Sequence, residues 1–356
     1  MSDIANLSKG IGISKDQLSA DGEPCILYGE LYTKYKSETI KEVISKTNID
    51  NTKLVKSKAN DVIIPCSGET AEEIATARCV LKDDILLGGD LNIIRLHGYD
   101  GSFMSYQLNG KRKYDIAKVA QGVSVVHLYG EHLKNIKTIN PSLNEQKKIA
   151  NLLSLLDERI STQNKIIEDL KKLKSAISER LFKDAKGDVI TLSEICDIVK
   201  GEQINGELLS EHGKYYVMNG GTDPSGYYDN YNVGAYTISI SEGGNSCGYV
   251  QFNKCPFWCG GHCYSIQNIA DNINNLYLYH YLKTEEKAIM KLRIGSGLPN
   301  IQKKNLATFK IKLPTSKQQK AISDILSLLE QKAEIEEQIL IAMQDEKQYL
   351  LRQMFI

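Results

Sequence analysis

The residues that most directly suggest chemistry lie in the second half of the chain. Cys255, Cys259, His262 and Cys263 fall within one short segment, with the spacing C-x3-C-x2-H-C. Thiolates and imidazoles are zinc ligands, but neighbouring residues in a strand point to opposite faces, so His262 and Cys263 cannot easily reach one ion. We therefore favour a buried strand carrying small apolar thiols, and we expect no metal in this chain.

Other catalytic patterns are absent from the sequence. No G-x-x-x-x-G-K-[ST] loop for a nucleoside triphosphate occurs. The stretch nearest to an adenine methyltransferase motif is Asn140-Pro141-Ser142-Leu143, which lacks the second proline and the aromatic residue that would stack on a flipped base. No metalloprotease, deaminase or catalytic-triad pattern is present. The sequence therefore predicts a protein that binds rather than one that catalyses.

Composition sets further limits. The chain has 356 residues, which suits two domains plus connecting segments. Lysine and arginine total 44 and so do aspartate and glutamate, so a basic surface for nucleic acid must be local. The first ten residues contain no apolar signal segment, and no apolar run approaches the roughly 20 residues of a membrane helix. We expect a cytoplasmic protein with reduced cysteines.

A long segment that occurs twice must position whatever these surfaces bind. Residues 141–182 return as residues 314–355 without a gap, and both copies contain a Leu-Ser-Leu-Leu block. Apolar residues recur at steps of three and four, which predicts a helix starting near Asn144 and nearly 60 Å long at about 1.5 Å per residue. Such a stripe needs a partner stripe, and the second copy supplies one in an antiparallel pair. Gln163 and Lys174 interrupt the stripe, and we interpret them as leaving room for a third protein.

The segments that precede the two helices are also copies of each other. Residues 2–10 lie over 193–201 at an offset of 191, and residues 121–128 lie over 294–301 at an offset of 173. Short runs of β-branched and apolar residues bounded by turn residues predict strands in both. We therefore predict an α+β protein with a pseudo-two-fold repeat, in which two long helices packed as an antiparallel coiled coil separate two β-rich domains. The predicted divisions are residues 1–140, 141–186, 187–313 and 314–356.

One feature breaks the repeat at its beginning. Residues 187–192, which lead into the second β-rich domain, have no counterpart before Ser2. We expect the first domain to lack the strand that this segment supplies to the second.

This layout resembles the specificity subunit of type I restriction–modification systems. The match rests on NEQKKIANLLSLLDERI (144–160) with its long helix, on SDIANLSKGIGISKDQL (2–18) and on ILYGELYTKY (26–35). The resemblance implies a non-catalytic reader of double-stranded DNA with two target-recognition domains, each reading half of an asymmetric, bipartite site. It also implies docking of two modification subunits, which carry S-adenosylmethionine and methylate adenine. Restriction subunits would complete a nuclease that uses ATP and Mg²⁺, and this chain itself would bind no cofactor.

On this interpretation, loops 28–36, 107–127, 219–231 and 242–248 read bases, and basic residues beside them hold phosphates. The phosphate candidates are Lys34, Lys36, Lys111, Arg112, Lys113, Arg293, Lys303 and Lys304. The other DNA-binding candidates are Tyr32, Tyr35, Ser124, Thr222, Ser225, Tyr227, Asn245, Ser296 and Asn300. The ordinary alternative is that a lysine is simply solvated and a tyrosine simply packs.

Two other functions stay open at this point. The chain could be a silent specificity cassette that never assembles. It could also be a zinc-dependent nuclease that uses the Cys255–Cys263 cluster, although the spacing disfavours this.

Overall fold

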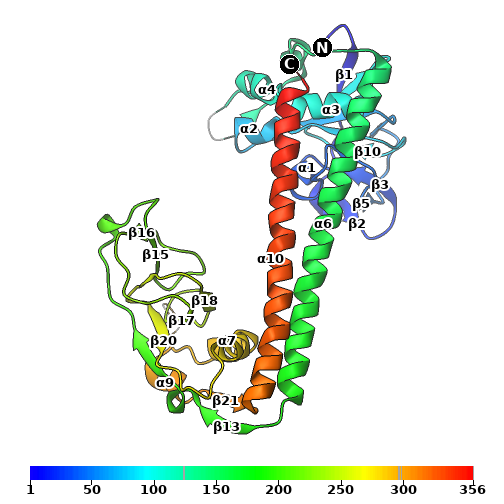
Figure 1. Ribbon diagram of the computed structural model, residues 1–356. Helices are drawn as coiled ribbons and strands as arrows, with labels where there is room; N and C mark the ends of the chain where they lie inside the picture. Colours follow the sequence, from blue (N-terminus) through cyan, green and yellow to red (C-terminus); the bar gives the residue numbers. More distant parts are fainter. Residues whose placement is uncertain (123–124, 296, 298, 356) are drawn as a thin grey trace. The chain divides into compact units, whose positions relative to one another are not determined.

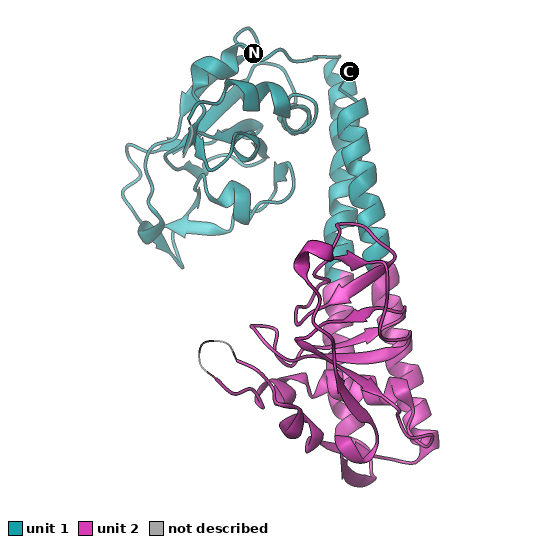
Figure 2. Ribbon diagram, turned by 90° about the vertical axis from the view of Figure 1, so that its left-hand side faces the viewer, with its two compact units in different colours: residues 1–165, 337–356 teal, residues 166–336 magenta. Residues whose placement is uncertain are grey.

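The computed structural model describes residues 1–122, 125–295, 297 and 299–355, so the candidates Ser124 and Ser296 lie outside the described part. The chain divides into two compact units (Figure 2). Unit 1 comprises Met1–Lys165 and Glu337–Ile356, and unit 2 comprises Ile166–Glu336. Each unit therefore combines one β-rich domain with a part of each long helix, rather than dividing at the borders of the helices.

Unit 1 contains two five-stranded sheets and one short strand pair. The first sheet consists, in spatial order, of β1 (Ala5–Lys9), β11 (Leu91–Leu96), β7 (Asp61–Pro65), β9 (Arg78–Val80) and β4 (Thr39–Ile40). The second consists of β2 (Leu18–Ser19), β5 (Ser45–Thr47), β3 (Glu23–Ile26), β10 (Leu86–Leu87) and β6 (Val55–Lys56). The pair is β8 (Ser67–Gly68) with β12 (Val126–His127). The short helices are η1 (Lys15–Gln17), α1 (Glu30–Thr33), α2 (Ala71–Ile74), α3 (Gly101–Asn109), α4 (Lys113–Val119) and α5 (Gly130–Lys134).

The sheets of unit 2 have fewer strands than those of unit 1. Its main sheet has the order β14 (Asp197–Lys200), β20 (Cys263–Gln267), β17 (Thr237–Ser241) and β18 (Val250–Asn253). Beside it lie a three-stranded sheet of β16 (Tyr227–Tyr228), β15 (Tyr215–Met218) and β19 (Trp258–Cys259), and the pair β13 (Asp188–Thr191) with β21 (Lys310–Leu313). The short helices are η2 (Leu192–Glu194), η3 (Gly206–Leu208), α7 (Asn275–Thr284), α8 (Glu286–Met290) and α9 (Lys303–Ala307).

The same pairing rules govern both units. The first strand of each main sheet pairs antiparallel with a longer strand beside it, as β1 with β11 in unit 1 and β14 with β20 in unit 2. A parallel pair then links the second sheet, as β3 with β10 and β15 with β19. The predicted duplication and the α+β class are thus confirmed by the strand topology.

The two predicted long helices are α6 (Leu143–Asp184) and α10 (Ser316–Gln353). In unit 1, Ala150 and Leu153 near the start of α6 share a core with Leu351 near the end of α10. In unit 2 the order is reversed, because Phe182 near the end of α6 packs with Ile322 near the start of α10. Each unit therefore shows antiparallel packing of the helix segments (Figure 1).

Both helices begin with the same reciprocal cap. Ser142 N donates to Glu145 Oε2 at 3.1 Å, and Glu145 N donates to Ser142 Oγ at 3.4 Å. Thr315 and Gln318 repeat this arrangement 173 residues later. This pattern is a capping box, which satisfies two otherwise unpaired N–H groups. Ser142, and not the predicted Asn144, is therefore the N-cap of α6.

Lys174 does not leave room for another protein. Its ammonium lies 3.1 Å from Glu330 Oε1 of α10, and both side chains are half-buried. Gln163 is also buried. The interpretation of these polar positions as an opening in the helix stripe was therefore wrong, because the chain itself satisfies Lys174.

The expected difference between the two β-rich domains is visible. In unit 2, β13 pairs with β21 immediately before α10. The equivalent segment of unit 1, residues 137–140, belongs to no named strand. There the amino group of Met1 donates to the carbonyls of Lys134 and Ile136 at 2.9 and 3.0 Å.

Candidate nucleic-acid interface

In unit 2, loops from distant parts of the sequence converge beyond the end of β17. The loop that follows Ser241 meets the segment before α9 through antiparallel bridges of Asn300 with Gly243 and with Ile294. Gly244 N donates to Pro299 O at 3.0 Å, and the carbonyl of Glu242 accepts from Ile301 N at 2.8 Å. The predicted loop 242–248 and residues 299–301, which precede the candidates Lys303 and Lys304, are thus parts of one surface.

Two more loops join this surface. Ser241 Oγ donates to Gly220 O at 2.6 Å, which attaches the loop after β15. Glu242 N donates to His262 O at 2.9 Å, which attaches the turn between β19 and β20. Gly220 has φ of +88°, a conformation that favours glycine, so the sequence supports this local turn.

A buried carboxylate sits beneath the surface. Glu242 is 2.7 Å from Lys200 Nζ and accepts a hydrogen bond from Tyr264 OH at 3.0 Å, while His262 Nδ1 lies 3.9 Å away. Lys200 thus balances the charge of Glu242. Arg293, Lys303 and Lys304 are exposed, as is Asn245, so the outer layer of this surface is cationic and hydrogen-bonding.

Unit 1 carries the same arrangement with different side chains. Here β8 meets β12 through His127 with Ser67, and His127 occupies the position of Asn300 at the offset of 173. Tyr32 OH donates to Ser67 O at 3.0 Å. Tyr32 and Ser67, together with Tyr28 and Val125, line a hollow of about 500 Å³. Burial raises the pKa of Tyr32, so its hydroxyl stays a hydrogen-bonding group rather than an anion.

Lys9 and Lys200 are equivalent residues that the sequence analysis missed. Each ends the first strand of its main sheet, and each is followed by a glycine. A Cβ on Gly10 would lie 2.0 Å from Gly88 O, and a Cβ on Gly201 would lie 2.3 Å from Gly260 O, so neither position tolerates a side chain. The signal was present as the shared Lys-Gly pair at 9–10 and 200–201. Lys9 Nζ lies 5.5 Å from the ring centre of Tyr129.

Several predicted DNA-binding residues of unit 1 are buried or form hydrogen bonds within the unit. Tyr35 is only 7% exposed and belongs to the core, with its hydroxyl accepting from Ile44 N. The ammonium of Lys34 lies 2.6 Å from Glu30 and 2.7 Å from Ser45 Oγ. Exposed Lys36 donates to Tyr32 O at 3.1 Å. The expectation that Tyr35 lies on the reading surface is therefore wrong, because the helical turn α1 directs it into the core.

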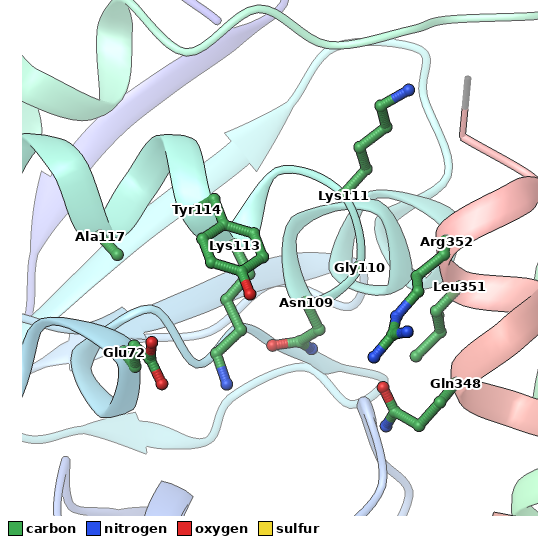
Figure 3. Close-up of a pocket in the computed structure, with 10 residues that line it drawn as sticks. All are labelled: Glu72, Asn109, Gly110, Lys111, Lys113, Tyr114, Ala117, Gln348, Leu351 and Arg352. Carbon is green, nitrogen blue, oxygen red and sulfur yellow. The ribbon is translucent and has the colours of Figure 1, made fainter. Parts of the chain in front are cut away.

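The basic knot 111–113 lies elsewhere on unit 1. Of the predicted loop 107–127, residues 107–109 belong to α3 and residues 113–119 to α4, and the knot comprises the turn between these helices and the first residue of α4. Arg112 pairs with Asp115 at 3.3 Å. Lys111, Lys113 and Arg352 of α10 line a hollow of about 570 Å³ (Figure 3). The Lys111 side chain points away from the other two. The knot thus lines a different hollow from the one beside β8 and β12.

The remaining candidates of unit 2 lie in the loop between β15 and β16. Thr222 Oγ1 donates to Asp223 at 2.9 Å, Ser225 N donates to Val217 O at 2.9 Å, and Tyr227 is half-buried in β16. These contacts hold the loop in shape and leave Thr222 exposed.

The cysteine cluster does not converge. Cys259 and Cys263 are buried in β19 and β20, whereas Cys255 is exposed and His262 turns toward Glu242. Within the described ranges of the chain, no group of three histidine, cysteine or acidic side chains could hold a metal ion. Burial raises the pKa of Cys196 to about 12 and of Cys25 and Cys66 to about 11, so these thiols stay protonated and packed.

No helix in the described part of the chain is both long enough and apolar enough to span a bilayer.

Known proteins share this organisation. A protein of Mycoplasma genitalium named as a type I specificity subunit is 33% identical over 147 residues, covering 40% of this chain. That alignment spans only 38% of the relative, which is less than half of its length. The type I restriction enzyme MjaVIII specificity subunit of Methanocaldococcus jannaschii is 26% identical over 375 residues, covering 93% of this chain and 86% of the relative.

Solved structures show the same fold. The crystal structure of a type I restriction–modification system S subunit from M. genitalium aligns with a TM-score of 0.69 at 22% identity, covering 100% of this chain and 94% of that one. A sequence profile described as the type I restriction modification DNA specificity domain matches residues 1–172 and 186–344, which is nearly the whole chain. The chain therefore belongs to the family of type I restriction–modification DNA specificity proteins.

Proposed function

We propose that this chain reads a bipartite, asymmetric DNA site for a type I modification and restriction complex, with each unit reading one half. The observation that carries the proposal is the repeated surface itself. Both units bring the loop after one strand of the main sheet, β7 or β17, against the segment before a short helix, α5 or α9. The bridged residues differ, because they are Ser67 and His127 in unit 1 but Gly243 and Asn300 in unit 2. A shared scaffold with different contact residues suits two readers of different sequences.

The chemistry of these surfaces fits DNA. Base edges are read by hydrogen-bonding side chains, and phosphates are held by lysine, arginine and backbone N–H groups. Unit 2 offers exposed Asn245, Asn300, Arg293, Lys303 and Lys304 on one surface. Half-sites about one helical turn apart, roughly 34–36 Å, would suit two readers on one face of a duplex.

Replacing Lys303 and Lys304 together with alanine is expected to weaken DNA binding across all sequences. Each lost phosphate contact lowers the slope of log K against log salt by about 0.9, so the double variant should lose roughly two units of slope. Fluorescence anisotropy at several salt concentrations measures this. Lys332→Ala is the matched control, because Lys332 is an exposed lysine paired with Glu336 on α10. An unchanged slope in the double variant would show that these lysines do not contact the backbone.

We further propose that two modification subunits dock on the outer faces of the long helices. Leu152 and Leu155 of α6 are each 51% exposed, although they lie on a helix that packs its other face. Their repeat equivalents, Ile325 and Leu328 of α10, are also exposed. Apolar side chains displayed twice at matched positions fit two copies of one partner.

The remaining roles are assigned to those partners. We propose that this chain is non-catalytic and cytoplasmic, and that S-adenosylmethionine, ATP and Mg²⁺ bind to modification and restriction subunits. The main alternative is a silent cassette that binds no modification subunit, which co-purification decides. The zinc-nuclease alternative has no metal-ligand group to support it among the described residues.

A further inference from the structure

We infer that two lysine–carboxylate bridges, Lys174–Glu330 and Lys347–Asp157, set the register of the two long helices and so the spacer length that the protein accepts between half-sites. The inference rests on the proposed function, because a spacer exists only if the chain reads two half-sites. It concerns residues that phosphate or base contacts do not explain. Each bridge lies within one unit and joins α6 to α10.

The two bridges are copies of each other. Lys174 Nζ lies 3.1 Å from Glu330 Oε1 in unit 2, and Lys347 Nζ lies 2.6 Å from Asp157 Oδ1 in unit 1. Lys347 follows Lys174 by 173 residues, and Glu330 follows Asp157 by the same 173. A lysine that occurs at the matched position of both helices, each time paired with a carboxylate, is a feature of the repeat and not of one unit alone.

Both bridges obey one pairing rule. The residue numbers of each bridge sum to 504, since 174 + 330 and 157 + 347 give the same value. Leu153 with Leu351, which share a core in unit 1, and Phe182 with Ile322, which share one in unit 2, also sum to 504. Apolar stripes alone would tolerate a slip of one heptad, because leucine can replace leucine. The charged pairs cannot.

A slip of seven residues would separate every acid from its lysine. Asp157 would then face Leu340 or Met354, depending on the direction. Glu330 would face Ile167 or Leu181. The unit 1 bridge is about nine-tenths buried, and a buried charge that loses its partner is strongly unfavourable. The unit 2 bridge is half-buried, so the cost there is smaller, but a single polar residue in a helix seam is a known means of specifying register.

The bridges also attach the helices to their β-rich domains. In unit 1, Asp157 accepts from Tyr106 OH at 2.7 Å, and Lys347 lies 2.5 Å from Glu38. In unit 2, Glu330 accepts from Tyr279 OH at 3.0 Å. The same carboxylates therefore fix how the helices pair and where each domain sits on them, which is what a defined spacing requires.

The test compares spacer preference in three forms of the full chain assembled with its modification subunits. The neutral form replaces both bridges by groups of similar shape, through Lys174→Met, Glu330→Gln, Lys347→Met, Asp157→Asn and Glu38→Gln. The glutamine and asparagine still accept from Tyr279 and Tyr106. The reversed form, Lys174→Glu with Glu330→Lys, keeps a bridge of opposite direction. Binding is measured on duplexes carrying the wild-type half-sites at the native spacer and at spacers one to four base pairs longer or shorter.

The wild-type and reversed forms are expected to share one preferred spacer. In the neutral form, the ratio of the affinity for the native spacer to the affinity for altered spacers should fall at least about tenfold, because specificity is a difference of affinities. The neutral form should still bind each half-site. The inference is overturned if the neutral form keeps the wild-type preference. It is equally overturned if the neutral form fails to fold, because the bridges would then serve stability rather than register. A wild-type protein that binds no bipartite duplex would instead refute the proposed function.

Discussion

Lys347→Met is expected to lower the free energy of unfolding by about 3–5 kcal/mol, because it leaves two buried carboxylates without their cation. Glu38 and Asp157 both lie within hydrogen-bonding distance of the Lys347 ammonium, and all three side chains are about nine-tenths buried. Burial alone would lower the pKa of Lys347, but the fields of Glu38 and Asp157 outweigh it and raise the pKa. Burial raises the pKa of Glu38 in spite of Lys347, so Glu38 should take up a proton once the lysine is gone.

Urea unfolding followed by far-ultraviolet circular dichroism measures the loss. Lys332→Met is the matched control, because Lys332 lies on the same helix and pairs with Glu336, but the Lys332 side chain is exposed. That control should change stability by no more than about 0.5 kcal/mol, as is usual for surface substitutions. A loss below about 1 kcal/mol for Lys347→Met would contradict the assignment of a buried three-residue cluster.

Leu155→Lys combined with Leu328→Lys is expected to abolish binding of both modification subunits. A charge placed in the centre of an apolar contact costs more than about 2 kcal/mol in a binding hot spot, which exceeds a 30-fold loss of affinity at each site. Folding should be unaffected, because both leucines are exposed in the free chain. Each single variant should keep one partner, since the two positions are repeat equivalents in different units.

Native mass spectrometry of the co-expressed complex counts the partners. The expected numbers of modification subunits are two for the wild type, one for each single variant and none for the double variant. Leu173→Lys is a control at an exposed position of α6 whose repeat equivalent is Glu346 and therefore not apolar. Two retained partners in the double variant would place the docking surface elsewhere, and no partner on the wild type would favour the silent cassette.

Much of the fold was predictable because its strongest signals are local. The α6 and α10 helices follow from apolar spacing over many turns, and β7 is a β-branched run of the kind from which strands were predicted. The break between α7 and α8 was not predictable from local sequence. The structure ends α7 at Thr284 and starts α8 at Glu286, where Glu286 accepts from Val250 N at 2.9 Å. That tertiary contact has no local signal.

The candidate interface was predictable only at the level of loops. The loops 219–231 and 242–248 meet, because Ser241 Oγ at the end of β17 donates to Gly220 O after β15. Lys9 and Lys200 were missed, since only strand pairing shows that each ends beside the loops of its own unit. Tyr35 was misplaced for the converse reason. Its sequence looks like a polar loop, but the turn that begins with α1 places Tyr35 in the core.

The central claim is that each unit reads one half of the site, and exchanging residues 187–313 for the corresponding domain of another specificity protein tests it most directly. Methylome sequencing of cells that express each form with modification subunits reports the methylated motif. The account predicts a bipartite motif for the wild type and, after the exchange, a new second half with the first half and the spacer unchanged. A motif altered in both halves, or in neither, would contradict it.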